Sequence, residues 1–547
     1  MRYQRLGTTI VLILALLLGT GCGSRDKTGP AVPPAAQLQP GGQLIYGSLQ
    51  EPNTLNPLLS DLLATAEIGS LIFSGLVQTN DKGEWVADLA SEVPTRANGG
   101  VSADGLTVVY RLRPGVTWHD GTPFTSADVK FTWELIMNRR ANVVSREGYE
   151  RISAVETPDA NTVIVRYRQF YAPYLTLFGT ILPKHRLEGE ADLNKAAFNR
   201  APVGTGPFKM REWRIAEAIY LEANPAYFKG RPNLDSLVYR FIPDVSIMLT
   251  QLKGGEVDIV SNIGLNQLEQ VKAVGGVRAV VTPNMIWEHL DFNLDNALFQ
   301  DMRVRQAIAL GLDRQAIIAN LLKGVASPAV GDQSPLSWAF NPALKAPARD
   351  LSAARELLAQ AGWKPGPDGV MVREGRRLDF TLVTTAGNKT REAVAQAIVQ
   401  QLKELGVSVT VRPVEVPAFF GDVLKARRFE AALYAWVAGL DPDNSSLWHS
   451  KNIPGAGNGY QGQNYPGWKS READALLEVG ERTVDLEGRR QAYLRIQELI
   501  VAEAPVIPLY FRSNIDAVRD VVVNYKPNPT QAGNLWNARE WGLTKKR

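Results

Sequence analysis

The chain has 547 residues, with 60 lysine and arginine residues against 56 aspartate and glutamate residues, so its formal net charge is +4. The charges are spread along the chain without basic blocks, which argues against binding to nucleic acid or to an acidic membrane surface. Hydrophobic residues make up 45% of the sequence. This length and composition predict three to four domain-sized units with substantial buried cores.

The N-terminus predicts an export signal. Arg2 and Arg5 precede an uncharged, mostly aliphatic run from Thr8 to Gly21. A run of about 14 residues is too short for a membrane-spanning helix, which needs about 20. A basic start, a short apolar run and small residues before a cleavage point are typical of a secretory signal. We therefore expect residues 1–21 to be a signal peptide.

Cys22 is the only cysteine in the chain and directly follows that apolar run. The segment Gly19-Thr20-Gly21-Cys22 resembles the lipobox of bacterial lipoproteins, although the usual leucine three residues before the cysteine is here Gly19. The resemblance implies cleavage before Cys22 and acylation of this residue. The alternative is an ordinary secretory signal that happens to contain a cysteine. In either case no disulfide can form within the chain.

Residues 22–40 are expected to be the acylated cysteine and a flexible tether. The segment "GSRDKTGPAVPPAAQLQP" is rich in Pro, Ala and polar residues and has no apolar periodicity. Eighteen residues of coil would reach about 23 Å, so the folded part would stay close to the membrane.

Strand and helix patterns then alternate along the chain. A strand begins at residues 41–59 and ends in a Pro/Asn-rich loop. A second strand leads to Leu112, followed by turns at Pro114-Gly115 and Asp120-Gly121 and by a helix from Ser126. Further expected elements are a strand at 162–168, two consecutive helices at 299–322 capped by Asp301 and Asp313, and helix or strand segments at 351–362, 378–384, 390–405, 408–414 and 428–436. The class is mixed α/β.

Motifs for catalysis or metal binding are weak. The four histidines are at positions 119, 185, 289 and 449, and no two have helical ligand spacing. One G-x-G-x-x-G match begins at Gly457, but it lies in a loop-like segment with no helix behind it, and no phosphate loop or nucleophile elbow occurs. Asp441 and Asp443 are paired carboxylates of a common surface type. The sequence predicts neither an enzyme nor a cofactor nor a metal site, and His449 has no second ligand nearby.

Several segments, in order, resemble the family 5 extracellular solute-binding proteins, which are receptors of oligopeptide, dipeptide and nickel ABC importers. The matching segments are "EPNTLNPLL", "DGLTVVYRLRPGVTWHDGTPFTSADVKFTWELI", "APVGTGPFKMREW", "LKGGEVDIV", "FNLDNALFQDMRVRQAIALGLDRQAII" and "APVIPLYF". They cover nearly the whole chain after the tether. The resemblance implies a two-lobed, periplasmic-binding-protein-like type II fold with a hinge and an additional domain near the N-terminus.

Matching these segments predicts the domain limits. Lobe domain I would comprise 41–69, 185–286 and 508–547, the extra domain II would comprise 70–184, and lobe domain III would comprise 287–507. Ligand would lie between the lobes, which close around it by hinge motion. The expected partners are a small-molecule or peptide ligand, the permease and ATPase subunits of an importer, and the membrane through the lipid anchor. We expect a monomer outside the cytoplasm, on the cell surface or in the periplasm.

The resemblance also places candidate ligand contacts, because peptide-binding relatives hydrogen-bond an extended peptide to edges of both lobes. These candidates are Asp61, Leu62 and Leu63 on the first lobe and Ala435, Trp436 and Val437 on the second. Trp436 would form a wall for the ligand; the alternative is a core tryptophan. For Asp61 the alternative is a solvated loop acid.

One departure from the family pattern concerns the ligand's charge. Peptide-binding relatives place an aspartate three residues beyond that tryptophan, whereas this chain has Gly439 there. Asp441 would replace the missing carboxylate if the ligand is an amine; alternatively, Asp441 or Asp443 caps a helix. Arg512 stands where relatives carry a tyrosine and would receive a carboxylate, or it is a surface arginine.

The residues leave the ligand open, because members of this family bind peptides, sugars, opines and metal chelates. Two other classes of protein compete with a receptor. An extracytoplasmic hydrolase would need a nucleophile with a base, and no such pattern is present. A structural envelope lipoprotein would show no stabilisation by any ligand.

We predict that Cys22→Ser leaves the fold intact and prevents acylation, because the thiol is the attachment point. Two or more acyl chains are needed for stable membrane retention. Detergent partitioning and intact mass would therefore show an unlipidated protein that either keeps its signal or leaves the detergent phase. Membrane retention of the variant, together with a free amino terminus in the wild type, would contradict lipidation at Cys22.

Overall fold

Two long antiparallel strands, β11 (Val277–Phe292) and β19 (Val506–Arg519), form the centre of the largest sheet. The computed structural model describes residues 38–530 and 532–545. The predicted signal peptide, Cys22 and the tether up to residue 37 lie outside the described residues. Gln39, which the sequence assigns to the tether, pairs with Leu543 and belongs to the described fold.

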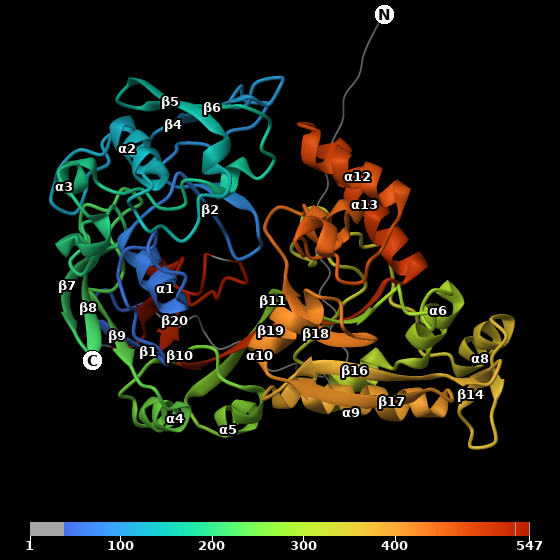
Figure 1. The fold of residues 1–547 in the computed structure, drawn as a ribbon. Helices are drawn as coiled ribbons and strands as arrows, with labels where there is room; N and C mark the ends of the chain where they lie inside the picture. Colours follow the sequence, from blue (N-terminus) through green and yellow to red (C-terminus); the bar gives the residue numbers. More distant parts are fainter. Residues whose placement is uncertain (1–37, 531, 546–547) are drawn as a thin grey trace, which may run out of the picture. The chain divides into compact units, whose positions relative to one another are not determined.

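The central strands have five strands on one side and three on the other (Figure 1). On one side lie β10 (Ile259–Val260), β1 (Gln43–Ser48), β9 (Ser236–Phe241), β8 (Ala218–Ala223) and β7 (Phe208–Arg214). On the other side lie β18 (Ala431–Val437), β16 (Asp379–Thr385) and β17 (Ser408–Val414). β12 (Ser327–Pro328) also pairs with β19. β11 and β19 therefore connect two groups of strands.

The pairing of β11 with β19 shifts register between Pro283 and Trp287 and again between Glu288 and His289. Proline has no backbone N–H and cannot donate to the ladder, which explains an interruption that begins at Pro283. The two strands are thus irregular at the point where they pass from one group of strands to the other.

The described fold contains three large hydrophobic cores. The first surrounds β1, β8 and β9 and includes Tyr46, Tyr239 and Trp541. The second lies over β16 and β18 between residues 290 and 510. The third consists of buried side chains between Leu76 and Ile181. The first and third cores adjoin, because Tyr149 and Val203 pack against both.

The third core is enclosed by a small sheet, a hairpin and one helix. The small sheet has the order β4 (Thr107–Arg111), β6 (Thr162–Tyr167) and β5 (Ile152–Asp159), and the hairpin pairs β2 (Val77–Thr79) with β3 (Trp85–Ala87). The helix α2 (Ser126–Met137) starts with a capping box between Thr125 and Asp128, as its predicted start at Ser126 requires. Gly115 and Gly121 have positive φ at the two predicted turns.

Helices cover both groups of strands. The first group carries α1 (Leu63–Ile72), α3 (Lys184–Leu187), α4 (Val245–Gly254) and α5 (Leu268–Lys272). The second carries α6 (Met302–Gly311), α7 (Arg314–Ala316), α8 (Leu351–Gln360), α9 (Lys389–Glu404), α10 (Val416–Ala418), α11 (Ser445–Trp448), α12 (Arg471–Arg482) and α13 (Leu486–Glu503). Asp301 and Asp313 accept backbone N–H groups at the starts of α6 and α7, which confirms both predicted caps.

Small elements complete the described fold. Three short strands form a separate sheet, β13 (Lys364–Pro365), β14 (Met371–Arg373) and β15 (Arg376–Arg377), and β20 (Val522–Val523) pairs with β21 (Gly542–Leu543). Most predicted helix and strand segments after residue 350 agree with the observed bounds within a few residues. The mixed α/β class is confirmed. In the part of the chain that is described, no helix combines the length and apolar character needed to cross a membrane.

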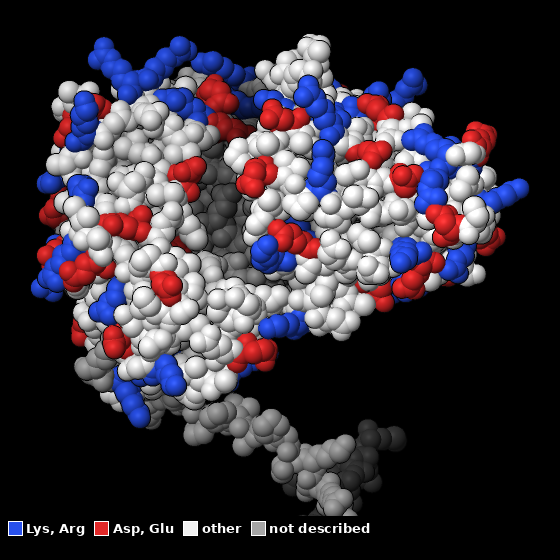
Figure 2. Space-filling view, turned by 60° about the horizontal axis from the view of Figure 1, so that its bottom comes forward, with Lys and Arg blue, Asp and Glu red and all other residues white. Residues whose placement is uncertain are grey.

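The surface is hollowed between the part that carries β7 to β9 and the part that carries α8 and α9 (Figure 2). Side chains of both charge signs are scattered over this face, as the composition predicts. The strands that connect these two parts are β11 and β19, so the residues where those strands change register lie between the two groups of strands that flank the hollow.

Candidate functional site

The end of β18 has an unpaired backbone edge. On one side, β11 pairs with β18 along its whole length, from Phe292 with Ala431 to Ile286 with Val437. On the other side, β16 pairs only with residues 431–433. Within the described chain, no strand pairs with residues 434–437 on that side. An exposed strand edge offers backbone donors and acceptors to another extended chain.

Burial decreases along the same residues. The side chains of residues 431–434 are buried, Ala435 and Trp436 are half-buried, and Val437 is 65% exposed. The strand therefore emerges from the core where its second neighbour ends. The predicted contact residues Ala435, Trp436 and Val437 lie together on this free edge.

Trp436 contributes an aromatic wall beside the edge. Its ring stacks on Tyr465, with ring centres 5.9 Å apart and planes at 20°, and meets Tyr434 edge-on at 5.6 Å. Trp436 also packs against two buried clusters. The structure thus combines both sequence interpretations, because the ring is anchored in the core and still partly exposed.

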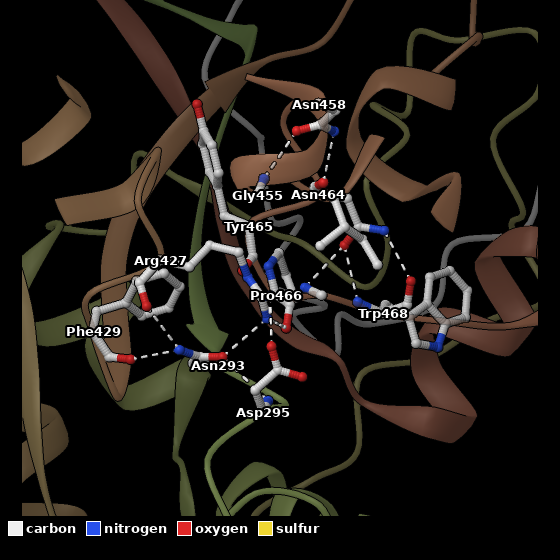
Figure 3. A network of polar contacts seen from close by, with 12 residues as sticks. Asn293, Asp295, Arg427, Phe429, Gly455, Asn458, Asn464, Tyr465, Pro466 and Trp468 are labelled. Atoms are coloured by element: carbon white, nitrogen blue, oxygen red, sulfur yellow. Dashed lines mark hydrogen bonds and ion pairs between the residues drawn. The ribbon is translucent and has the colours of Figure 1, made fainter. Parts of the chain in front are cut away.

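Arg427 fixes the position of the Tyr465 loop (Figure 3). Its Nε donates to the carbonyl oxygen of Tyr465 at 2.9 Å, and its Nη2 donates to Pro466 O at 3.1 Å and to Asn293 Oδ1 at 3.0 Å. Its Nη1 forms an ion pair with Asp295 at 2.6 Å. With four such contacts on one guanidinium, the wall formed by Tyr465 and Trp436 is held in place before any ligand arrives.

The residues predicted on the opposite edge do not form a strand. Leu62 is the residue before the first turn of α1, and Leu63 is the first residue of that helix. Asp61 and Leu63 are exposed, Leu63 by 53%, whereas Leu62 is half-buried. These residues therefore lie at a helix start and form no free strand edge like the one at residues 435–437, and the backbone N–H and C=O of Leu62 are already hydrogen-bonded to Ser60 and Ala66.

A buried carboxylate between two arginines occupies the irregular part of the central strands. Glu288 on β11 is 1% exposed. Arg391 at the start of α9 donates to both of its oxygens at 3.0 Å, and Nε of Arg512 on β19 donates to Oε1 at 2.9 Å. Burial raises the pKa of Glu288, but Arg512 and Arg391 outweigh burial and hold that pKa below its ordinary value.

This cluster lines a cavity of about 270 Å³, which we call the hinge cavity; Asn388, Thr390 and Tyr510 also line it. Two arginines share one carboxylate, so the cluster carries one excess positive charge. Arg391 is buried, whereas the Arg512 side chain is 33% exposed. Arg512 is therefore not a simple surface arginine, because it pairs with Glu288 while part of its side chain stays exposed. The excess positive charge makes the hinge cavity suited to an anionic group.

The loop after β18 places Gly439 and Asp441 at a second cavity. Gly439 is exposed, and the cavity of about 350 Å³ is lined by Gly439, Asp441 and Asp443 together with Glu147, Glu481 and Arg151. We call it the acidic cavity. Its lining combines residues from the third core's region with residues of the loop after β18.

Asp441 already has a partner of opposite charge. Its Oδ1 accepts from Nη2 of Arg489 at 2.7 Å, and the two side chains are only 14% and 6% exposed. Pro442 is held as well, because Gln333 donates to its carbonyl oxygen at 3.1 Å. Asp443, in contrast, accepts the backbone N–H of Ser445 at the start of α11. Asp443 thus contacts the first residue of α11, although the N-cap of that helix is Asn444, whose side chain makes no capping hydrogen bond.

Sequence reasoning missed the groups that support these contacts, namely Glu288, Arg391, Arg427, Tyr465 and Arg489. One signal was available: Glu288 is one of three polar residues, with His289 and Asp291, inside the strand segment "MIWEHLDF". A charge inside a buried strand usually needs a partner of opposite sign. Nothing in the local sequence identifies Arg391, 103 residues away, as that partner.

His449 lies near two acids but not at a metal centre. Its ring nitrogens are 3.4 Å from Asp474 and 3.6 Å from Glu478, both on α12. Among the described residues, no group of three or more His, Cys, Asp or Glu side chains is arranged to hold a metal ion.

The family model for bacterial extracellular solute-binding proteins, family 5, matches residues 84–458. The oligopeptide-binding protein AppA of Bacillus subtilis is 31% identical over 548 residues, which cover 98% of this chain and 98% of that protein. The structure of AppA in complex with a nonapeptide covers 93% of this chain and 100% of the AppA chain, with a TM-score of 0.67. CtaP of Listeria monocytogenes, a substrate-binding protein of an ABC transporter, is 25% identical and has a TM-score of 0.80, covering 93% of this chain and 100% of CtaP.

These structures confirm the type II periplasmic-binding-protein fold that the sequence predicts. NikZ of Campylobacter jejuni, solved in complex with Ni(L-His), has the same fold at 27% identity and a TM-score of 0.70, covering 92% of this chain and 100% of NikZ. The matches are to solute-binding proteins, which confirms the prediction of a binding protein rather than an enzyme.

We predict that Asp441→Asn destabilises the protein by about 3 kcal/mol, because removing one partner of a largely buried ion pair leaves Arg489 without its counter-charge. Urea and thermal unfolding measure the loss. The matched control is Asp443→Asn, which should cost less because Asp443 only accepts hydrogen bonds at a helix start. Unchanged stability of Asp441→Asn, with a loss confined to ligand affinity, would contradict this structural role.

Proposed function

Because the chain belongs to the family 5 bacterial extracellular solute-binding proteins, we propose that it is a lipid-anchored receptor that captures peptides between two lobes and delivers them to an ABC importer. The observation that carries the peptide assignment is the unpaired edge of β18 beside Trp436. A peptide has backbone donors and acceptors at the spacing of a strand, whereas a sugar does not.

Relatives with known ligands support this choice. AppA was solved with a nonapeptide, DppA of Helicobacter pylori with the peptide STSA, and an oligopeptide-binding protein of Thermus thermophilus with a pentapeptide. They are 31%, 26% and 29% identical to this chain. Because this chain shares the fold of these peptide-binding relatives, we expect its ligand to be a peptide. The wall of Trp436 and Tyr465 would pack against one side chain of that peptide.

The charges at the two cavities would orient the peptide. The hinge cavity has an excess positive charge from Arg391 and Arg512, which suits the terminal carboxylate. The acidic cavity carries Glu147, Asp443 and Glu481, which suit the terminal ammonium. The strand end at residues 435–437 would receive the main chain that runs from one cavity toward the other.

We propose the domain limits given by the sequence: 41–69, 185–286 and 508–547 for domain I, 70–184 for domain II and 287–507 for domain III. Their support is the presence of the two limits 286/287 and 507/508 inside the connecting strands β11 and β19. Domains I and II would be in close contact, because the core around β1, β8 and β9 also includes Ile136 and Leu182. The register shifts in this strand pair are suited to absorb a hinge rotation. The importer would recognise the closed form, because ligand favours that form.

The anchor would be the acylated Cys22, with residues 23–40 as a short tether to the membrane. A receptor that delivers solute to a membrane transporter benefits from staying near it. The cell surface and the periplasm are both compatible with this arrangement.

The receptor proposal is tested with a panel of peptides, sugars, amino acids and the Ni(L-His) complex, by thermal shift and solution scattering. We expect only peptides to stabilise the protein, by about 2.7 kcal/mol at 100 times the dissociation constant, and to reduce its radius of gyration. Far-UV circular dichroism should stay constant, since rigid lobes rotate. Stabilisation by Ni(L-His) alone would replace the peptide assignment, and no response to any ligand would contradict the receptor proposal.

We further predict that Arg512→Gln weakens binding of peptides with a free terminal carboxylate by about tenfold, because one charge-assisted hydrogen bond is lost. The fold should survive, since Arg391 still pairs with Glu288. Calorimetry compares each peptide with its C-terminal amide, for which the substitution should have no effect. Equal losses for the acid and the amide would show that Arg512 does not receive the carboxylate.

A further inference from the structure

The largest cavity of the three lies beyond the free edge of β18, away from the hinge. It has a volume of about 660 Å³ and is lined on one side by residues between 82 and 176 and on the other by residues between 336 and 489. Four half-buried aromatic side chains stand in its walls: Trp85, Phe170, Tyr174 and Trp338. We call it the aromatic cavity.

The walls of the aromatic cavity are held by specific contacts. Arg489, which is 5% exposed, lies over the Trp338 ring at 5.3 Å and is paired with Asp441. The two sides also touch each other at its margins. A Cβ added to Gly83 would lie 2.9 Å from the carbonyl oxygen of Leu336, and one added to Gly105 would lie 2.8 Å from Val484. The cavity is therefore a built space between two packed surfaces.

The aromatic cavity adjoins the acidic cavity. Six residues line both of them: Phe170, Ala172, Pro173, Thr176, Leu440 and Asp441. The acidic cavity in turn reaches Gly439, two residues after the end of β18. Gly439 is exposed and has no side chain to close this passage. A chain that follows the free edge of β18 can therefore continue past Gly439 into the aromatic cavity.

We propose that the aromatic cavity binds a large apolar side chain, aromatic or long aliphatic, from the amino-terminal residue of the peptide ligand. This specificity rests on the proposed peptide-receptor function. The receptor would thereby select peptides by their first residue, in addition to binding any peptide's main chain at β18.

Charge and size determine this occupant. The carboxylates of Glu147, Asp443 and Glu481 beside the passage favour the end of a peptide that carries the ammonium group. The neighbouring aromatic walls favour an apolar side chain on that same residue. Ligand sites in proteins commonly have volumes of about 300–1,000 Å³, so the cavity has room for a side chain of this kind.

The test compares peptide pairs of three to nine residues that differ only in their first residue, phenylalanine or glycine. Calorimetry on the full chain gives the ratio of their dissociation constants. We expect phenylalanine to bind about tenfold to a hundredfold more tightly, which corresponds to burial of one large apolar side chain.

Two variants localise the effect. Thr176 is exposed and lines both cavities, so Thr176→Trp should fill the passage without disturbing a core. We expect it to abolish the preference for phenylalanine while the glycine peptides still bind. Trp85→Ala should reduce the preference, because one aromatic wall is removed. The matched control is Trp536→Ala, a half-buried tryptophan that lines none of the three cavities, and it should leave the preference unchanged.

The outcomes separate this inference from the receptor proposal. Tight binding of peptides without any preference for phenylalanine would overturn the aromatic cavity as a subsite and leave the peptide receptor standing. The same conclusion would follow if Thr176→Trp kept the full preference. If no peptide bound at all, both the proposed function and this inference would fall.

Discussion

The carboxylate of Glu288 is the constraint on which the interlobe region depends. It is buried on β11 and takes hydrogen bonds from Arg391 on α9 and from Arg512 on β19. Burying the Glu288 carboxylate without an arginine partner would cost several kcal/mol, so Glu288 depends on these arginines. This dependence ties both connecting strands to the start of a helix at the place where the strand pair changes register. A hinge built there would be flexible in its backbone and fixed in its side chains.

In the same cluster, one arginine balances the buried carboxylate and the other provides the excess positive charge. One arginine is enough to neutralise Glu288, and Arg391 reaches both of its oxygens from a buried position. Arg512 is the more exposed of the two and completes the excess positive charge. At Asp441 no charge is left over, because Arg489 neutralises that carboxylate. The sequence predicts Asp441 and Arg512 alike as contacts for a charged group of the ligand. Their ion-pair partners in the structure distinguish them, because Asp441 is neutralised and Arg512 adds excess charge.

Much of the fold was predictable from local sequence, because caps, turns and alternating patterns act over a few residues. Asp301 and Asp313 begin their helices as expected, and α2 starts at Ser126 as predicted. The site was only partly predictable. Trp436 lies at the free edge of β18 as the family resemblance implies, but residues 61–63 precede and enter a helix and form no strand. The polar contacts of the site join positions far apart in the sequence, such as Glu288 with Arg391 at 103 residues and with Arg512 at 224 residues, and no short-range pattern encodes such pairs.

The substitution of Gly439 for the family's aspartate acquires a physical meaning from its surroundings. An aspartate there would set a single negative charge at the end of β18 and fix the ammonium group of a ligand at that point. A glycine leaves the passage to the acidic and aromatic cavities unobstructed, while the negative charge is distributed over Glu147, Asp443 and Glu481 further along. In the proposed peptide receptor, the ammonium would be attracted beyond the strand end, where Trp85 and Trp338 line the aromatic cavity. Loss of one anchoring carboxylate and access to a deeper, apolar subsite would then be two consequences of the same change.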